Sequence, residues 1–191
     1  MHIFLGILVL GLMFISAPSK ADDISDFEIE GMTIGDSLLE FATKENIQLG
    51  KVKYYENDKY TVTELYPYEF KINISTFDLM QMQFLTNDKK MRIESISGIN
   101  YYKNNIKDCY EKLDDIYEEV FLVLSSWKDL GKEAYEVSSD KITDYMLESN
   151  SQDEVQIGCY DYFDDTKNVD HFRIAIRTSA YRTWLREQVY N

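Results

Sequence analysis

Apolar and polar residues alternate in several short segments, which is the pattern of half-buried strands. Segments 80–84 and 172–176 alternate most clearly, and segment 60–65 is rich in β-branched and aromatic residues. We expect a strand at each of these three places. Further strands are predicted at 142–147 and 155–163, and 51–55 is expected to pair with 60–65.

Segment 80–84 is predicted to form a hairpin with the residues that follow the turn Asn87-Asp88. A loop of two or four residues preserves the parity of the two strands. Apolar side chains then gather on one face of the hairpin, and polar side chains oppose one another on the second face. The expected apolar face holds Met80, Met82, Phe84, Met91 and Ile93, and the expected polar pairs join Gln81 and Gln83 to Arg92 and Glu94.

Apolar residues three or four positions apart predict helices in other parts of the chain. The strongest signal covers 106–124, where Asn104 or Asn105 caps a long helix with an acidic, solvated opposite face. The polar stretch 125–141 follows it, and Gly131 is interpreted as a helix stop.

Two shorter helices are expected near the ends of the domain. One begins at a capping box formed by Thr33 with Asp36 or by Ser37 with Glu40, and it ends near Asn46. The other follows Thr178 or Ser179 and carries apolar residues on a single stripe.

The same order of elements, a hairpin followed by a helix, occurs at 79–124 and at 154–189. Sequence identity between the two units is slight, so whether they are a true repeat stays open. Strands that are neighbours in sequence favour antiparallel pairing. The sequence therefore predicts an α+β fold, with an antiparallel sheet packed by helices on one face, in a single domain over 22–191.

The first residues have the pattern of a secretory signal peptide. Residues 3–15 form an apolar run shorter than the roughly 20 residues of a spanning helix. Ser19 and Ala21 are small residues at the −3 and −1 positions, so a signal over 1–21 is expected to be cleaved before Asp22. An uncleaved N-terminal anchor is the alternative. No later segment is apolar enough to span a bilayer, and the periplasm is the expected location.

The chain is strongly acidic. Its formal net charge is −14, and loss of the signal with Lys20 takes this to −15. Such a surface repels phosphate backbones and anionic lipid headgroups, and no basic patch offsets the repulsion. Nucleic-acid binding is therefore not expected. The many Asn, Lys and Ile residues and only two prolines suggest a bacterial source with an AT-rich genome.

Cys109 and Cys159 are the two cysteines of the chain, and an even count in an exported protein predicts a disulfide. Cys109 falls on the apolar stripe of the long helix, and Cys159 alternates with Val155 and Ile157 on the expected inner face of its strand. Both thiols are thus expected at one helix–sheet interface. A bridge closing about 50 residues would contribute about 4 kcal/mol. Two buried free thiols are the alternative.

The block Gly35-Asp36-Ser37-Leu38 matches the motif that names the GDSL-type ester hydrolases, in which the serine is the nucleophile. That chemistry needs a histidine oriented by an aspartate three residues before it, and an oxyanion hole. The one histidine beyond the signal is His171, and Asn168 holds the place of the aspartate, while Asp170 is adjacent. Helix capping explains Asp36 and Ser37 better, and His171 is interpreted as a surface or strand-end residue.

Two groups of residues could hold a metal. Met80 and Met82, with Met91 opposite, resemble methionine pairs that bind Cu(I), but their alternation with glutamines favours a core face. An acidic group could offer oxygen ligands to Ca²⁺, but it lacks the spacing of an EF-hand loop and is interpreted as a solvated turn. That group comprises Asp153, Glu154, Asp161, Asp164 and Asp165.

Tyrosines form the remaining candidate surface. Several of the 15 tyrosines could line a site for a partner, or could be ordinary sheet residues. The candidates are Tyr54, Tyr55, Tyr66, Tyr68, Tyr101 and Tyr102.

Several segments give the chain a family likeness. They are residues 27–39, 87–90, 95–98, 104–106, 109–110 and 159–161. With these the chain resembles small exported proteins of marine alphaproteobacteria that have no assigned activity, so the resemblance implies no function. The segment Gly31-Met32-Thr33, which leads into the first predicted helix, also resembles the corresponding segment of small lipoproteins of the outer-membrane assembly machinery and of the β-lactamase-inhibitor-like fold. The chain lacks the lipobox cysteine of those lipoproteins.

The sequence thus predicts no catalytic residue, cofactor or metal site. The expected function is a non-catalytic periplasmic binding or interaction protein with a protein or small-molecule partner in the envelope. An ester hydrolase with Ser37 as nucleophile and a metal-binding carrier are the alternatives. The identity of the ligand and the oligomeric state stay open.

Overall fold

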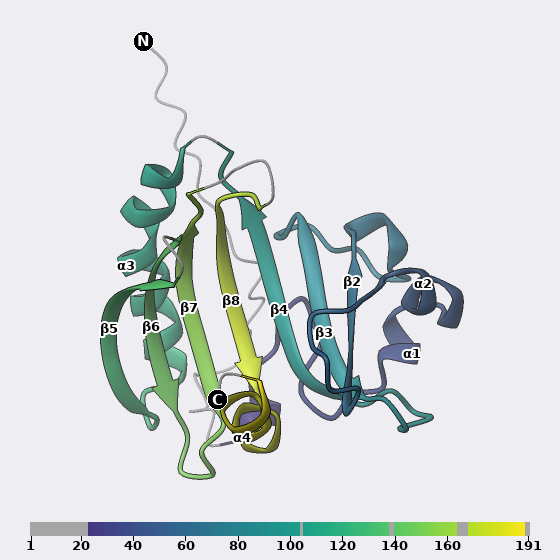
Figure 1. The fold of residues 1–191 in the computed structure, drawn as a ribbon. Coiled ribbons are helices and arrows are strands. Elements are labelled where there is room, and N and C mark those ends of the chain that lie inside the picture. Colours follow the sequence, from purple (N-terminus) through teal and green to yellow (C-terminus); the bar gives the residue numbers. More distant parts are fainter. Residues whose placement is uncertain (1–22, 104, 138–139, 164–167, 190–191) are drawn as a thin grey trace.

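The alternating segments of the sequence form one continuous antiparallel sheet (Figure 1). The computed structural model describes residues 23–103, 105–137, 140–163 and 168–189. The expected signal over 1–21, its cleavage site before Asp22, and Asp164 and Asp165 lie outside these residues. The strand order is β1-β2-β3-β4-β8-β7-β6-β5. The strands are β1 (Lys51–Val52), β2 (Tyr60–Leu65), β3 (Leu79–Leu85), β4 (Ile93–Tyr101), β5 (Lys128–Val137), β6 (Asp140–Glu148), β7 (Glu154–Asp161) and β8 (His171–Arg177).

The predicted hairpin is present as β3 and β4, but its register differs from the expected one. Gln81 and Gln83 lie opposite Ser97 and Ser95, not opposite Arg92 and Glu94 as predicted. The loop over 86–92 is longer than the two or four residues assumed, and the register shifts between Gln83 and Phe84. Such a bulge restores the alternation that the longer loop would otherwise disturb.

Two short helices replace the single helix predicted to end near Asn46. They are α1 (Leu38–Phe41) and α2 (Lys44–Leu49). Ala42 between them is extended and forms an isolated β-bridge with Phe70, which breaks the helical path. Thr43 caps α2 by accepting a hydrogen bond of 3.1 Å from the backbone N–H of Asn46.

The polar stretch after the long helix is strand β5, so the prediction that Gly131 stops a helix is wrong. Gly131 has a φ of 89° and lies where the pairing of β5 with β6 shifts register after Asp129. A left-handed glycine at a bulge explains this position. Because β5 is an edge strand whose residues are mostly exposed, it lacks the alternation that marks the other strands.

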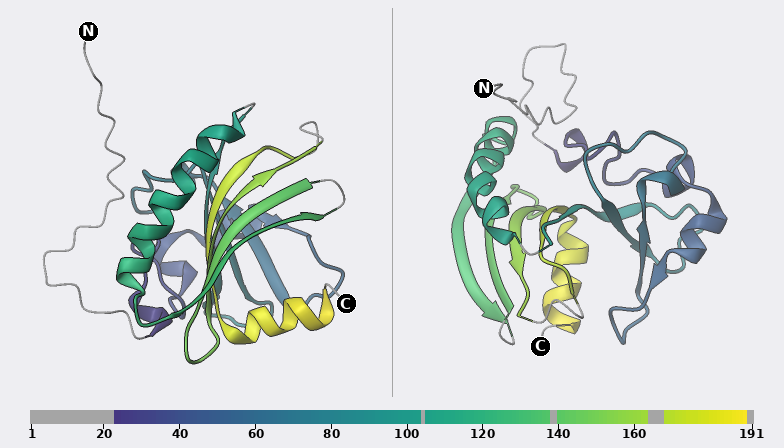
Figure 2. Two further views of the ribbon diagram at one scale, coloured as in Figure 1. Left: turned by 90° about the vertical axis from the view of Figure 1, so that its left-hand side faces the viewer. Right: turned by 90° about the horizontal axis from the view of Figure 1, so that it is seen from above.

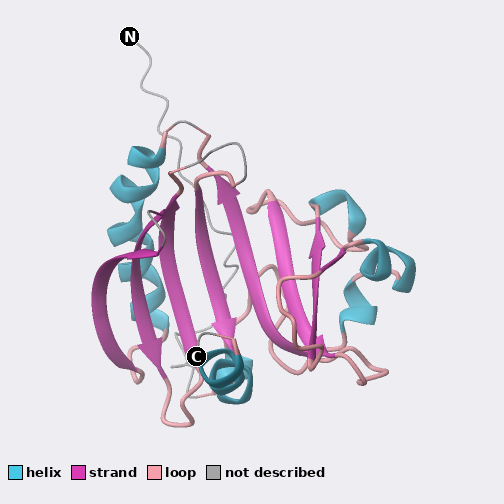
Figure 3. Ribbon diagram, viewed as in Figure 1, coloured by secondary structure: helices cyan, strands magenta, loops and turns pink. Residues whose placement is uncertain are grey.

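The long helix α3 (Ile106–Val123) and the terminal helix α4 (Ser179–Gln188) lie on opposite faces of the sheet (Figure 2). Cys109 of α3 bonds to β7, whereas Tyr181 and Trp184 of α4 pack on Tyr60 of β2. We refer to these sides as the α3 face and the α4 face. The α+β class holds, with the sheet dominating (Figure 3). The prediction of helices on one face is wrong, because apolar residues of β2 to β4 also need cover on the α4 side.

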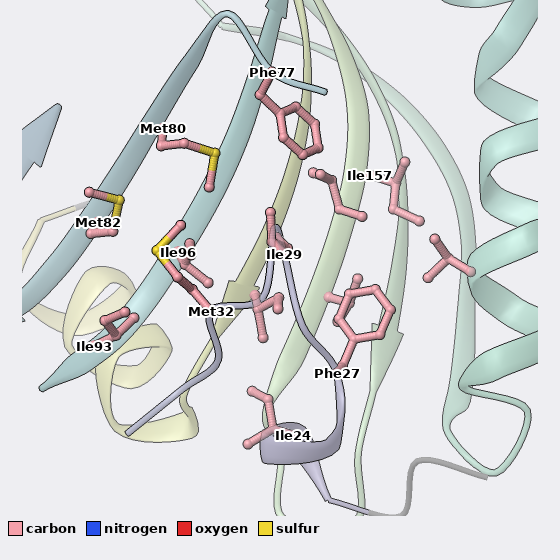
Figure 4. Close-up of a cluster of buried hydrophobic side chains, with 14 of the residues drawn as sticks. Ile24, Phe27, Ile29, Met32, Phe77, Met80, Met82, Ile93, Ile96 and Ile157 are labelled. Atoms are coloured by element: carbon pink, nitrogen blue, oxygen red, sulfur yellow. The ribbon is translucent and has the colours of Figure 1, made fainter. Parts of the chain in front are cut away.

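The α3 face carries the main core. The chain segment before α1 runs across the strands and inserts Ile24, Phe27, Ile29 and Met32 among their apolar side chains (Figure 4). Met80 and Met82 lie in this core with no exposed surface, as the alternation predicted. Cys109 and Cys159 form the predicted disulfide there, with their Cα atoms 6.0 Å apart.

In the described part of the chain, no helix is long and apolar enough to cross a membrane.

Candidate functional site

The α4 face of the sheet is unusual because many of its buried side chains are polar. Alternation along each strand turns these residues away from the core of the α3 face. Those that are less than a tenth exposed include Gln81, Gln83, Ser95, Ser97, Asp144, Gln156 and His171. Buried polar groups are unfavourable unless they find hydrogen-bond partners. The side chains of this face therefore need such partners, whereas those of an apolar core do not.

A cavity of about 490 Å³ lies on this face, beside the C-terminal end of α4. Its volume falls within the range of small-molecule sites, roughly 300–1,000 Å³. Figure 2 shows the strands bending away from α3 toward the side on which α4 lies. The cavity is lined by Tyr54, Tyr55, Glu64, Leu79, Gln81, Ile99, Tyr101, Tyr162, Asn168, Val169, His171, Arg173 and Val189.

Glu64 on β2 receives a chain of hydrogen bonds along the cavity wall. Gln83 donates from Nε2 to Oε1 of Gln81 over 2.9 Å, and Gln81 donates from its own Nε2 to Oε1 of Glu64 over 2.8 Å. The Tyr54 hydroxyl donates to the same Oε1 over 2.6 Å. Two donors, Tyr54 and Gln81, thus fix one oxygen of the carboxylate and leave Oε2 without a hydrogen bond to a described residue.

Arg173 on β8 is the cation of the cavity. Its Nε atom is buried and has no acceptor. Among the described residues it forms no ion pair, although its guanidinium lies 5.5 Å from the ring centroid of Tyr160. The residue as a whole is half-buried, and a partly desolvated guanidinium without a carboxylate or carbonyl partner is unfavourable, so this group is suited to bind an anion.

His171 presents an acceptor to the same cavity. Its Nδ1 lies 2.9 Å from the carbonyl oxygen of Val169, and since a carbonyl can only accept, Nδ1 carries the proton. Nε2 is then an acceptor, and it is buried without a partner. Burial and the charge of Arg173 lower the pKa of His171 to about 4, so the ring is neutral at pH 7. Stacking on Tyr160, with centroids 4.7 Å apart, holds its orientation.

Tyrosine hydroxyls complete the polar lining. Burial raises the pKa of Tyr54, Tyr101 and Tyr162, while the charge of Arg173 acts on all three in the opposite direction. The hydroxyls therefore stay protonated and can donate hydrogen bonds at neutral pH. Because one guanidinium influences all three, it lies within electrostatic reach of each of them.

A second buried polar group, Asp144 on β6, lies further along the α4 face. Its Oδ2 accepts hydrogen bonds from Gln156 and, over 3.2 Å, from Tyr135, while Oδ1 has no partner. Burial raises the pKa of this carboxyl. Tyr160 donates to Gln156 over 3.4 Å and so links this group to the residues around Arg173.

The residues of the hydrolase hypothesis are not brought together. Ser37 forms an isolated bridge with Arg92, just before β4, whereas His171 pairs with Tyr101 at the far end of that strand. At 3.3 Å per residue the two positions are about 30 Å apart. The Ser37 hydroxyl donates to the carbonyl of Lys90 over 2.7 Å. Asn168 lines the cavity instead of orienting His171 toward a serine.

The candidate metal ligands have other roles. Met91, the third methionine of that set, is 8% exposed and belongs to the same core as Met80 and Met82. Asp153 accepts from the backbone of Ser179 over 2.8 Å, and Asp161 accepts from Tyr110 over 3.3 Å. In the ranges that the structure describes, no group of three or more His, Cys, Asp or Glu side chains could hold a metal.

The sequence pointed to part of this site. Of the candidate tyrosines, Tyr54, Tyr55 and Tyr101 line the cavity, while Tyr66 and Tyr68 stack on each other elsewhere, with ring centroids 5.8 Å apart. Glu64 and Arg173, the charged residues of the cavity, were missed. The alternation of each with apolar neighbours was visible, but only the sheet order shows that they face one cavity.

No protein-family model, curated protein or solved structure matches this chain.

Proposed function

We propose that this protein is an exported binding protein that holds a small organic carboxylate in the cavity on the α4 face. The observation that carries the proposal is Arg173, whose guanidinium lines the cavity without an ion pair among the described residues. A ligand carboxylate would accept the hydrogen bonds that Arg173 lacks. Charge-assisted bonds of this kind are among the strongest that proteins make.

The walls of the cavity favour a ligand with an apolar or aromatic body. Leu79 and Ile99 supply aliphatic surface, and the rings of Tyr54, Tyr55 and Tyr101 supply aromatic surface. Aromatic pairs add favourable edge and stacking contacts to the burial of apolar area. The tyrosine hydroxyls and Nε2 of His171 add polar contacts that can orient the ligand.

The proposal also includes the cellular location of the protein and its assignment as a binding protein instead of an enzyme. The disulfide between Cys109 and Cys159 is typical of an oxidising compartment, which supports export to the periplasm. An enzymatic role has less support, because Ser37 donates to Lys90 at a distance from His171. A binding role without catalysis accounts for the residues that line the cavity.

Isothermal titration calorimetry with 3-phenylpropionate and with its neutral amide, 3-phenylpropanamide, tests the proposal. The two probes share ring and chain length and differ only in charge. The carboxylate is expected to bind at least tenfold more tightly than the amide. Replacing Arg173→Gln is expected to weaken carboxylate binding about tenfold to hundredfold, because a hydrogen bond to a charged group contributes about 1.5–3 kcal/mol.

Lys89→Gln is the matched control, because it removes one positive charge from an exposed loop residue. Its carboxylate affinity is expected to equal that of the wild type. Equal binding of acid and amide, or equal loss in both variants, would contradict the proposal. Circular dichroism of each variant confirms that the sheet is intact before binding is compared.

A further inference from the structure

The cavity is lined by two opposite charges. Among its lining residues, Glu64 and Arg173 are the acidic and basic side chains, and His171 is neutral at pH 7. Neither Glu64 nor Arg173 has an ion-pair partner in the described part of the chain. The two groups are therefore both available to a ligand.

Their positions on the sheet keep the two charges apart. Glu64 lies on β2 and Arg173 on β8, with β3 and β4 between them. Three strand spacings of about 4.8 Å separate the backbones by about 14 Å. Both charges nevertheless act on the same hydroxyls, since Glu64 raises and Arg173 lowers the pKa of Tyr54 and of Tyr101, on top of the effect of burial. The charges thus flank a shared space lined by these tyrosines.

A ligand with only a negative charge fits this arrangement poorly. Its carboxylate would pair with Arg173, but Glu64 would stay uncompensated and would repel it across the cavity. The net charge of −14 would add long-range repulsion of any anion approaching the protein. A ligand that also carries a positive charge removes both penalties.

We propose that the ligand is a zwitterion, with its carboxylate on Arg173 and its ammonium group on Glu64. This inference rests on the proposed binding function and narrows its ligand to molecules of the amino-acid type. Oε2 of Glu64 is the acceptor for the ammonium group, because Oε1 already accepts from Tyr54 and Gln81. The tyrosine rings around Glu64 offer additional favourable contact to a cation.

Calorimetry with three probes that share a phenyl ring tests the inference on the wild-type protein. L-Phenylalanine carries both charges, 3-phenylpropionate carries only the carboxylate, and 2-phenylethylamine carries only the ammonium group. Phenylalanine is expected to bind about tenfold or more tightly than either single-charge probe. Tighter or equal binding of 3-phenylpropionate would overturn the zwitterion while leaving the proposed function standing.

Two variants test whether the ammonium group of the ligand binds to Glu64. Glu64→Gln is expected to reduce phenylalanine affinity about tenfold, to the level of 3-phenylpropionate, without weakening 3-phenylpropionate. Glu111→Gln, which removes an exposed carboxylate of α3 on the other face of the sheet, is the control and is expected to change neither affinity. Unchanged phenylalanine binding in Glu64→Gln would overturn the inference. Failure of every probe to bind through Arg173 would overturn the proposed function with it.

Discussion

Glu64 and Arg173 face one cavity from β2 and β8, and neither pairs with the other. Unpaired charges in partly buried positions are usually disfavoured, because desolvation is not offset by a partner. Here the intervening strands β3 and β4 keep the two side chains apart. A bound molecule that bridges them would provide the missing partners, so we interpret the separation as a property of the proposed binding site.

Loss of the disulfide is expected to destabilise the fold without altering the cavity. Cys109→Ala combined with Cys159→Ala should lower the free energy of unfolding by about 2–5 kcal/mol, as is typical of native disulfides. Urea unfolding followed by circular dichroism measures the change. Because the bridge lies on the α3 face, affinity for 3-phenylpropionate at 15 °C should match the wild type. A double variant that is folded at this temperature but binds 3-phenylpropionate more weakly would contradict this separation of roles.

Titration of His171 should make stability depend on pH. Its pKa is about 4 in the folded protein and about 6.5 when unfolded, so between these values the unfolded state binds a proton that the folded state does not. Stability is therefore lost as the pH falls from 6.5 to 4, by about 3 kcal/mol from this group. The free energy of unfolding in urea is measured across this pH range for wild type and for His171→Gln. The difference between the two profiles isolates the contribution of His171. Parallel pH profiles for the two proteins would contradict it.

Loss of a buried ion pair beneath α4 should lower the free energy of unfolding far more than loss of an exposed pair. Glu154 lies 2.6 Å from Arg177, and it also pairs with Arg182 over 2.8 Å. Glu154→Gln is expected to cost about 3–5 kcal/mol, because Arg177 stays buried without its partner. Glu56→Gln, which removes an exposed pair with Lys53, is the control and should cost less than about 1 kcal/mol. Guanidinium unfolding curves measure the free energy of unfolding of both variants. Equal losses of stability would contradict the prediction that the buried pair contributes more.

Gly98 on β4 is expected to be intolerant of a larger side chain. A Cβ atom there would lie 2.6 Å from the ring of Phe77, which covers this point of the strand. Gly98→Ala should cost about 1–3 kcal/mol through overpacking. In a double-mutant cycle with Phe77→Leu, the combined cost should be smaller than the sum of the single costs, because the smaller side chain makes room. Strict additivity would mean that the two residues do not interact.

Much of the fold could be predicted from local patterns. β2, α3 and α4 lie where their periodicity placed them, and Thr178 caps α4 by accepting from the backbone of Tyr181 over 3.1 Å. The disulfide followed from two periodicities that pointed to one interface. These features depend on residues close in sequence, or on one face of one element.

Long-range arrangement could not be predicted in the same way. Strand β5 is exposed along an edge, so its polar residues do not alternate, and Gly131 suggested a helix end where there is a bulge. The face taken by α4 depends on the pairing of β4 with β8, which no local pattern records. The cavity depends on it too, because that pairing brings Arg173 into line with the residues of β2 and β3.

The most direct measurement follows the Nε–Hε resonance of Arg173 by NMR while 3-phenylpropionate or L-phenylalanine is added. Assignment of this resonance comes from its absence in the Arg173→Gln variant. If Arg173 binds the ligand carboxylate, its Hε signal shifts downfield with the same saturation curve that calorimetry reports. A ligand that binds by calorimetry while this resonance does not move would contradict the assignment of the cavity as the binding site.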